Sequence, residues 1–123
     1  NTPPVMAIYA VNRSLNWLHE NGGVAKMESK NRAKAKKLYD EIERNPLFKC
    51  PVHSDDRSIM NVPFIFNERF DEKRFLEFCH DRGLQTLKGH RSVGGFRASI
   101  YNAMPEAGVD ALIDAMRDYE NFV

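Results

Sequence analysis

Cysteine is scarce in this chain: only Cys50 and Cys79 occur among 123 residues. Two cysteines are too few for the disulfide framework of a small secreted domain, and neither a signal peptide nor a long apolar run opens the sequence. Excess charge is missing too, because 18 basic and 17 acidic residues give a formal charge of +1. We therefore expect a cytoplasmic protein with no general attraction for nucleic acid or membranes, in which any anion site is local.

The length and composition suit one domain. A chain of 123 residues can bury a core without disulfides or a structural metal, and 42% hydrophobic with 28% charged residues is an ordinary globular balance. The first residue is Asn1 instead of methionine, and the chain leads at once into a helix-start signal. We interpret it as a fragment of a longer polypeptide.

Local signals predict four helices. Thr2 can cap a first helix, which the Gly22–Gly23 pair is expected to end. A second helix is expected over 24–44, and two more are expected to begin at Asp71 and at Pro105. The apolar faces expected in the last three helices contain Met27, Ala35, Leu38, Ile42, Phe75, Leu76, Cys79, Val109, Leu112, Ile113 and Met116.

From Ile59 the apolar period changes to two, which predicts a strand through Met60, Val62, Phe64 and Phe66. Pro63 lies inside this run and lacks an N–H, so we expect its position to face an edge or a bulge. Shorter strands are expected at 48–52, 84–87 and 97–101.

These elements together predict an α/β protein built as an α+β-like small domain. The order strand, helix, strand, strand, helix from residue 57 onward indicates a three- to four-stranded, mainly antiparallel sheet. We expect helices packed on one face of this sheet and a long N-terminal helix before it.

A basic cluster in the second predicted helix favours a solvated helix face over a nucleic-acid site. No aromatic residues are interleaved with it, and acidic residues follow at once. A nucleic-acid site here would require an affinity that depends steeply on salt. The cluster consists of Lys26, Lys30, Arg32, Lys34, Lys36 and Lys37.

Cys50 and His53 are spaced like half of a zinc motif, with Cys79 and His80 as the available second half. Adjacent residues on a helix point in different directions, so this second pair is poorly arranged for a metal. We expect no metal site.

The stretch GHRSVGGFRASIYN at 89–102 holds the most informative group of cations, His90, Arg91 and Arg97. In a straight strand the two arginines would lie about 20 Å apart, too far to share one small molecule. Gly94 and Gly95 can take positive φ and reverse the chain, which would gather the three cations around a small dianion. The alternative is that both arginines pair with surface carboxylates and that His90 binds a carbonyl.

Several motifs carry a resemblance to a known family. NTPP at 1–4, NGG at 21–23, MNVPF at 60–64 and LKGHRSVGGFRASIYNAMP at 87–105 resemble the C-terminal part of the phosphoserine aminotransferases. These are class V, fold-type I enzymes that depend on pyridoxal phosphate. The resemblance covers nearly the whole chain, and the segment 31–57 matches only loosely in character.

The resemblance implies transfer of an amino group between glutamate and 3-phosphohydroxypyruvate in serine biosynthesis, with a related phosphorylated substrate in vitamin B6 synthesis. It also implies a homodimer. In the family, Arg97 would hold the substrate α-carboxylate, and His90 with Arg91 would bind the phosphate of phosphoserine or the side-chain carboxylate of glutamate. Asn1 and Thr2 would reach the cofactor phosphate of the neighbouring subunit.

The resemblance further implies that residues 1–123 form the single C-terminal domain of a larger aminotransferase. Residues 1–23 would be an interface helix and residues 24–123 a small sheet-and-helix domain. The catalytic lysine would belong to the missing large domain, because Lys88 is expected to be solvated. We therefore expect this chain alone neither to hold pyridoxal phosphate covalently nor to transaminate.

The alternative is a free-standing module that binds an anionic metabolite without catalysis. Such a module should cover its apolar surface, whereas a severed domain should expose the surface on which the large domain docks. Met6, Tyr9 and Trp17 are candidates for an exposed patch of this kind, although they could equally pack in a core.

Overall fold

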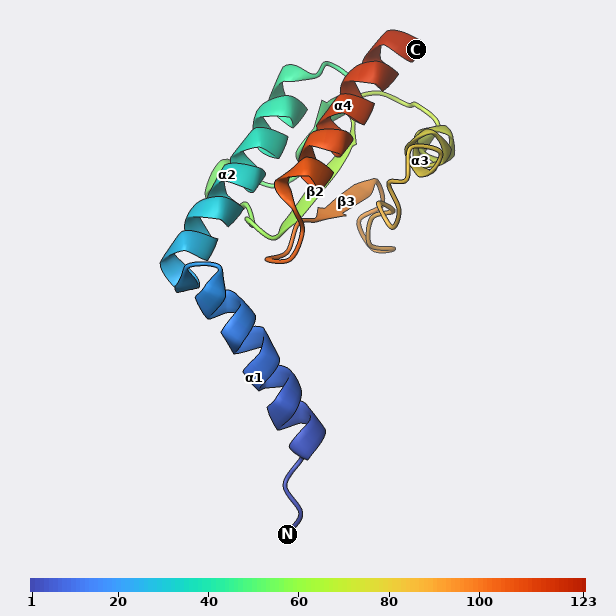
Figure 1. The fold of residues 1–123 in the computed structure, drawn as a ribbon. Coiled ribbons are helices and arrows are strands. Elements are labelled where there is room, and N and C mark those ends of the chain that lie inside the picture. Colours follow the sequence, from blue (N-terminus) through green and yellow to red (C-terminus); the bar gives the residue numbers. More distant parts are fainter. The chain divides into compact units, whose positions relative to one another are not determined.

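A computed structural model describes residues 1–123, which form four α-helices, one short 3-10 helix and a three-stranded sheet (Figure 1). The chain divides into two compact units, residues 1–30 and residues 31–123. None of the helices combines the length and the apolar character that a membrane span requires. The elements are α1 (Val5–Glu20), α2 (Gly23–Arg44), β1 (Phe48–Lys49), η1 (Ser54–Asp56), β2 (Asn61–Phe66), α3 (Glu72–His80), β3 (Phe96–Ser99) and α4 (Glu106–Phe122).

Helix α1 dominates the first unit and contains no buried residue. Its N-cap is Pro4, which makes no side-chain cap hydrogen bond, so the predicted capping role of Thr2 is wrong. The reason is that both prolines precede the helix, which begins only at Val5. The predicted glycine stop is confirmed, since α1 ends before Gly22 and Gly23, which have φ of 95° and 75°.

The strands pair antiparallel, as predicted, and their order in the sheet is β1-β2-β3. In β2 buried and half-exposed residues alternate, which confirms the period-two pattern in the sequence. One face of the sheet therefore carries the core, and the other face, with Asn61 and Ile65 of β2 and Arg97 and Ser99 of β3, is only partly covered. We call this second face the open face.

Two predicted strands are shorter or absent. Residues 84–87 are not a strand, because Thr86 has a φ of 60°, and only Lys88 pairs with Phe96 through an isolated bridge. The run predicted at 48–52 is reduced to the two residues of β1, which ends before it reaches the position beside Pro63. β1 therefore does not pair with Pro63, which has no N–H to donate to a neighbouring strand.

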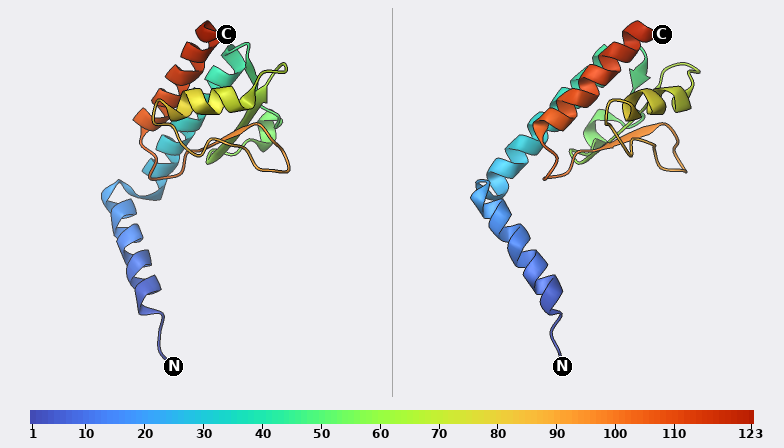
Figure 2. Two further views of the ribbon diagram at one scale, coloured as in Figure 1. Left: turned by 90° about the vertical axis from the view of Figure 1, so that its right-hand side faces the viewer. Right: turned by 45° about the vertical axis from the view of Figure 1, so that its right-hand side comes forward.

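The core is a cluster of phenylalanines packed between the sheet and the helices. Phe75 of α3 is fully buried, and its ring lies 4.8 Å from that of Phe96 and 4.9 Å from that of Tyr119, measured between centroids. These contacts join β3, α3 and α4, so the helices cover one face of the sheet (Figure 2). The apolar residues predicted to face the core are buried in all three helices, apart from the half-buried Leu76.

Lys34 of α2 is buried, although the sequence predicts a solvated face for its cluster. The residue is 4% exposed, and its Nζ donates to the carbonyls of Ile100 at 3.3 Å, Tyr101 at 2.9 Å and Met104 at 2.9 Å. The prediction is wrong at Lys34 because the segment between β3 and α4 passes over it. Lys36, two positions further on, is exposed as predicted.

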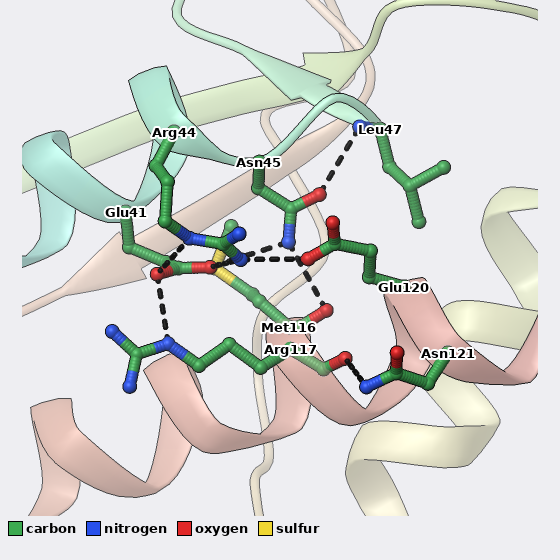
Figure 3. A network of polar contacts seen from close by, with 8 residues as sticks. All are labelled: Glu41, Arg44, Asn45, Leu47, Met116, Arg117, Glu120 and Asn121. Atoms are coloured by element: carbon green, nitrogen blue, oxygen red, sulfur yellow. Dashed lines mark hydrogen bonds and ion pairs between the residues drawn. The ribbon is translucent and has the colours of Figure 1, made fainter.

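A polar network joins α2 to α4, which run side by side (Figure 3). The Glu41 side chain is only 1% exposed, and its carboxylate accepts from Arg44 Nε and Arg117 Nε, both at 3.0 Å. Asn45 Nδ2 donates to the same carboxylate and to the Met116 carbonyl. A buried carboxylate therefore acts as the hub between the two helices.

Glutamine in place of Glu41 is expected to lower the free energy of unfolding by about 1–3 kcal/mol at neutral pH, since charge-assisted hydrogen bonds are lost. Burial acts against ionisation of Glu41, but the hydrogen bonds from Arg44, Arg117 and Asn45 outweigh it and hold the pKa of this carboxyl below its ordinary value. A lowered pKa contributes stability above the pKa of the unfolded chain, and this stability is lost as the pH falls through the folded-state pKa.

Urea unfolding of the wild type and of Glu41→Gln should therefore differ at neutral pH and converge as the pH falls through the folded-state pKa of Glu41. Glu43→Gln is the matched control, because the Glu43 carboxylate is mostly exposed in its pair with Arg57. A difference for Glu41→Gln that stays constant across this pH range would contradict the role of its charge.

Candidate functional site

The segment 89–95 forms a tight loop between Lys88 and Phe96, which pair as an isolated bridge. The amides of Val93 and Gly94 donate to the His90 carbonyl at 2.9 and 2.8 Å, and the Gly89 amide donates to the Gly95 carbonyl at 2.8 Å. Gly94 and Gly95 have φ of 75° and 61°, so the predicted chain reversal at positive φ is confirmed.

Two glycines in this loop are also required by close packing. A Cβ on Gly89 would collide with the carbonyl of Gly94, and a Cβ on Gly95 would lie 2.5 Å from Ile65 Cγ2 and 2.8 Å from the Phe64 carbonyl oxygen. The loop therefore rests directly on β2, and this contact fixes where β3 begins.

His90 and Arg91 are exposed on this loop. The His90 Nδ1 lies 2.7 Å from Ser92 Oγ, so its ring is bound to a hydroxyl and not to a carbonyl. Neither Arg91 nor Arg97 has a carboxylate within 4.0 Å. The structure therefore contradicts the alternative in which both arginines pair with surface carboxylates.

Arg97 lies half-buried on the open face of the sheet. Its backbone N–H donates to the Leu87 carbonyl at 2.7 Å. This hydrogen bond holds β3 beside the irregular segment that precedes the loop. Its side-chain Nε is buried and has no hydrogen-bond partner. The backbone reversal pairs residues 87–89 with residues 95–97, and His90 and Arg91 lie in the loop between them. No hydrogen bond joins the three cationic side chains, so their convergence on one ligand stays a prediction.

A hydroxyl and amide cluster lies on the same open face. Asn61 Oδ1 accepts from Ser99 Oγ at 3.2 Å and from the Tyr101 hydroxyl at 3.1 Å. Sequence reasoning missed this cluster, although the polar positions of the two alternating strands were a signal for it.

The other predicted site residues lie in the first unit. Asn1 and Thr2 are exposed and precede α1, whose first turn carries no side-chain cap. The N-terminus of a helix presents free N–H groups and a partial positive charge, which favours an anion such as phosphate.

The remaining reactive side chains do not form a site of their own. Lys88 is exposed, and no group of three or more His, Cys, Asp and Glu side chains is placed to hold a metal ion. Burial raises the pKa of the Cys79 thiol to about 12, so this cysteine is an inert core residue.

The structure thus combines a half-open antiparallel sheet, a loop bent at Gly94 and Gly95 that carries His90 and Arg91, and a buried Arg97 Nε without a hydrogen-bond partner. The aminotransferase class-V family model matches residues 1–112, and the chain belongs to this family.

The chain is 51% identical over 122 residues to the phosphoserine aminotransferase of Parabacteroides distasonis, which covers 98% of this chain and 34% of that protein. It is 49% identical over 120 residues to the phosphoserine aminotransferase of Lactiplantibacillus plantarum, covering 98% of this chain and 34% of that protein. The chain thus spans about a third of the length of the curated relatives it matches.

Solved structures give the same result. A phosphoserine aminotransferase from Bacillus circulans subsp. alkalophilus matches with a TM-score of 0.93 and 41% identity, over 99% of this chain and 34% of that chain. The pyridoxal-phosphate-bound phosphoserine aminotransferase from Trichomonas vaginalis matches with a TM-score of 0.87 and 49% identity, over 95% of this chain and 34% of that chain. The predicted fold class is therefore confirmed.

Proposed function

We propose that this chain is the C-terminal part of a phosphoserine aminotransferase that moves an amino group between glutamate and 3-phosphohydroxypyruvate in serine biosynthesis. A related phosphorylated substrate of vitamin B6 synthesis would be compatible with the same chemistry. The observation that carries the proposal is Arg97, a half-buried guanidinium on the open face with a buried, unpartnered Nε, which follows directly after a cationic loop. Relatives and solved structures of this activity, each about three times as long, support it.

In this proposal Arg97 binds the α-carboxylate that phosphoserine and glutamate share. A guanidinium matches a carboxylate with two parallel hydrogen bonds, which fixes the orientation of the amino acid as well as its position. Such orientation is a large part of the rate that an enzyme gains.

His90 and Arg91 would bind the second anion of the substrate, either a phosphate or a side-chain carboxylate. Both are exposed on a loop whose backbone is held by hydrogen bonds at its two ends and in its turn. Because these two anions differ in charge, an arginine beside a histidine that can gain a proton suits both.

Pyridoxal phosphate would supply an electron sink for the amino-group transfer when it is bound. The fit of this chain to that group is limited to phosphate contacts: Asn1 and Thr2 lie exposed ahead of the N-terminus of α1. The lysine that holds the cofactor covalently is proposed to lie in the rest of the full-length enzyme, as Lys88 is exposed at the bridge to β3. The chain alone is therefore proposed to be inactive.

Helix α1 supports the interpretation as part of a larger enzyme. We propose that residues 1–23 form an interface helix for the large domain or the partner subunit of a cytoplasmic homodimer, and that residues 24–123 form the small domain. A free-standing module has no reason to leave such an apolar surface uncovered. The exposed apolar residues of α1 include Val5, Met6, Ile8, Tyr9, Val11, Leu15 and Trp17.

In the full-length enzyme, Arg97→Lys is expected to raise the KM for phosphoserine and for glutamate about 10- to 100-fold, because one charge-assisted hydrogen bond is lost in the substrate complex. Steady-state kinetics with both amino acids measures this. Arg82→Lys is the control, because Arg82 packs on the Phe78 ring away from the open face and should leave both KM values unchanged. If the full-length protein binds phosphoserine but transfers no amino group, the result would instead favour the alternative of a module that binds an anionic metabolite without catalysis.

A further inference from the structure

Asn61 at the start of β2 has its side-chain amide held by two hydroxyl groups. Its Oδ1 accepts from Ser99 Oγ at 3.2 Å and from the Tyr101 hydroxyl at 3.1 Å. An amide oxygen has two lone pairs, so these two hydrogen bonds saturate it. The Nδ2 donates to no atom of the protein, and its two N–H groups remain available on the open face.

Asn61 is also a close neighbour of Arg97. In the β2–β3 register Asn61 lies opposite Ser99, and Arg97 lies opposite Pro63. Both residues therefore point to the same face and are diagonal neighbours across the two strands, with Cα atoms about 7–8 Å apart. This separation is within reach of a long arginine side chain, so one carboxylate can contact both groups.

The donors at this place exceed the acceptors. Arg97 has no carboxylate within 4.0 Å and a buried Nε without a partner, and the Asn61 amide has two free N–H groups. A buried donor without an acceptor has lost its hydrogen bonds to water, which favours a ligand that brings acceptors. A carboxylate brings two oxygens with about four lone-pair sites, more than an arginine fork alone can fill.

We propose that Asn61 is a second carboxylate-binding residue, which donates from Nδ2 to the α-carboxylate held by Arg97, while Ser99 and Tyr101 position its amide. This inference rests on the proposed function, because it takes the Arg97 carboxylate as its ligand. A neutral donor adds direction without adding charge, so Asn61 helps to fix the rotation of the carboxylate about the guanidinium. No bond is made or broken by these residues.

Two substitutions at Asn61 test the proposal in the full-length enzyme. Asn61→Ala removes the donor and is expected to raise the KM for phosphoserine and for glutamate about 5- to 20-fold, the loss of one hydrogen bond to a charged group. Asn61→Asp keeps the size and the Oδ1 that Ser99 and Tyr101 bind, but replaces the donor with an anionic oxygen. It should raise both KM values more than Asn61→Ala does, because a carboxylate there repels the substrate and pairs with Arg97.

The positioning role has its own readout. Tyr101→Phe should raise both KM values about 2- to 5-fold, and it should have no further effect when Asn61 is already alanine. Tyr119→Phe is the matched control, because it also removes a tyrosine hydroxyl but on the core side of the sheet, where Tyr119 of α4 packs on Phe75. Thermal unfolding of every variant shows whether a raised KM comes from loss of fold. If Asn61→Ala does not fold, the KM values of Asn61→Asp and Tyr101→Phe still test the proposal.

The outcomes separate this inference from the proposed function. If Arg97→Lys raises both KM values while Asn61→Ala and Asn61→Asp leave them unchanged, Asn61 does not bind the carboxylate and only this inference is overturned. If Arg97→Lys itself has no effect, the carboxylate site is wrong and both proposals are overturned. Coupling between Arg97→Lys and Asn61→Ala in a double-mutant cycle would support a shared ligand group.

Discussion

Methionine in place of Lys34 is expected to lower the free energy of unfolding by about 2–5 kcal/mol, because the change removes a charged donor from three carbonyls, of which that of Tyr101 keeps a second donor, the Met104 amide. Methionine keeps most of the apolar stem, so the loss reports the ammonium and not a large cavity. The carbonyls of Ile100, Tyr101 and Met104 lie in the segment that joins β3 to α4, and Asn31 holds the same segment through Asn102 at 2.7 Å. Chemical denaturation of the wild type and the variant measures the effect.

The matched control is Lys36→Met on the same helix. The Lys36 side chain is 76% exposed and pairs only with Asp40, one helical turn away, so its replacement should change stability by no more than about 0.5 kcal/mol. Equal losses for the two variants would show that the carbonyl contacts of Lys34 add nothing to the fold.

These two lysines also mark what the sequence could not predict. Both belong to one basic cluster in a helix, and helical spacing alone cannot separate the buried member from the exposed one. The difference is set by the segment 100–104, more than sixty residues away in the chain, whose carbonyls need a donor. Glu41 is hidden from sequence reasoning in the same way, because its partner Arg117 is 76 positions away.

The parts that could be predicted are those set by neighbours in the chain. Asp71 caps α3 through its own carboxylate, which accepts from the amides of Lys73 and Arg74, and the alternation in β2 follows from its side-chain period of two. The strand predicted at 84–87 failed because short apolar runs carry little information about φ, and Thr86 takes a positive value there.

The candidate site likewise has a part that follows from local sequence and a part that depends on strand pairing. The glycine pair and the nearby cations could be found from the sequence, since positive φ at Gly94 and Gly95 is a local property. Asn61 could not, because its partners Ser99 and Tyr101 lie 38 and 40 residues away and meet it only through strand pairing. The register of β2 on β3 thus creates the part of the site that no motif contains.

Alanine in place of Gly95 is expected to cost about 2–4 kcal/mol of folding stability and to weaken substrate binding by the full-length enzyme as well. Part of the loss, about 1–2 kcal/mol, comes from a φ of 61° that alanine adopts poorly. The rest comes from contact, since the new Cβ would lie 2.5 Å from Ile65 Cγ2 and 2.8 Å from the Phe64 carbonyl oxygen. The carbonyl is backbone, so β2 and the loop must separate.

Gly94→Ala isolates the backbone part of this effect. Gly94 has a φ of 75°, but a Cβ added there would meet nothing within 4 Å, so alanine should cost only about 1–2 kcal/mol. Because Arg97 lies two residues after Gly95, on the strand that the loop anchors to β2, we expect Gly95→Ala to raise the KM for both amino acids and Gly94→Ala to raise it far less. Equal stability losses and equal KM values for the two variants would mean that the contact of Gly95 with β2 does not set the position of Arg97.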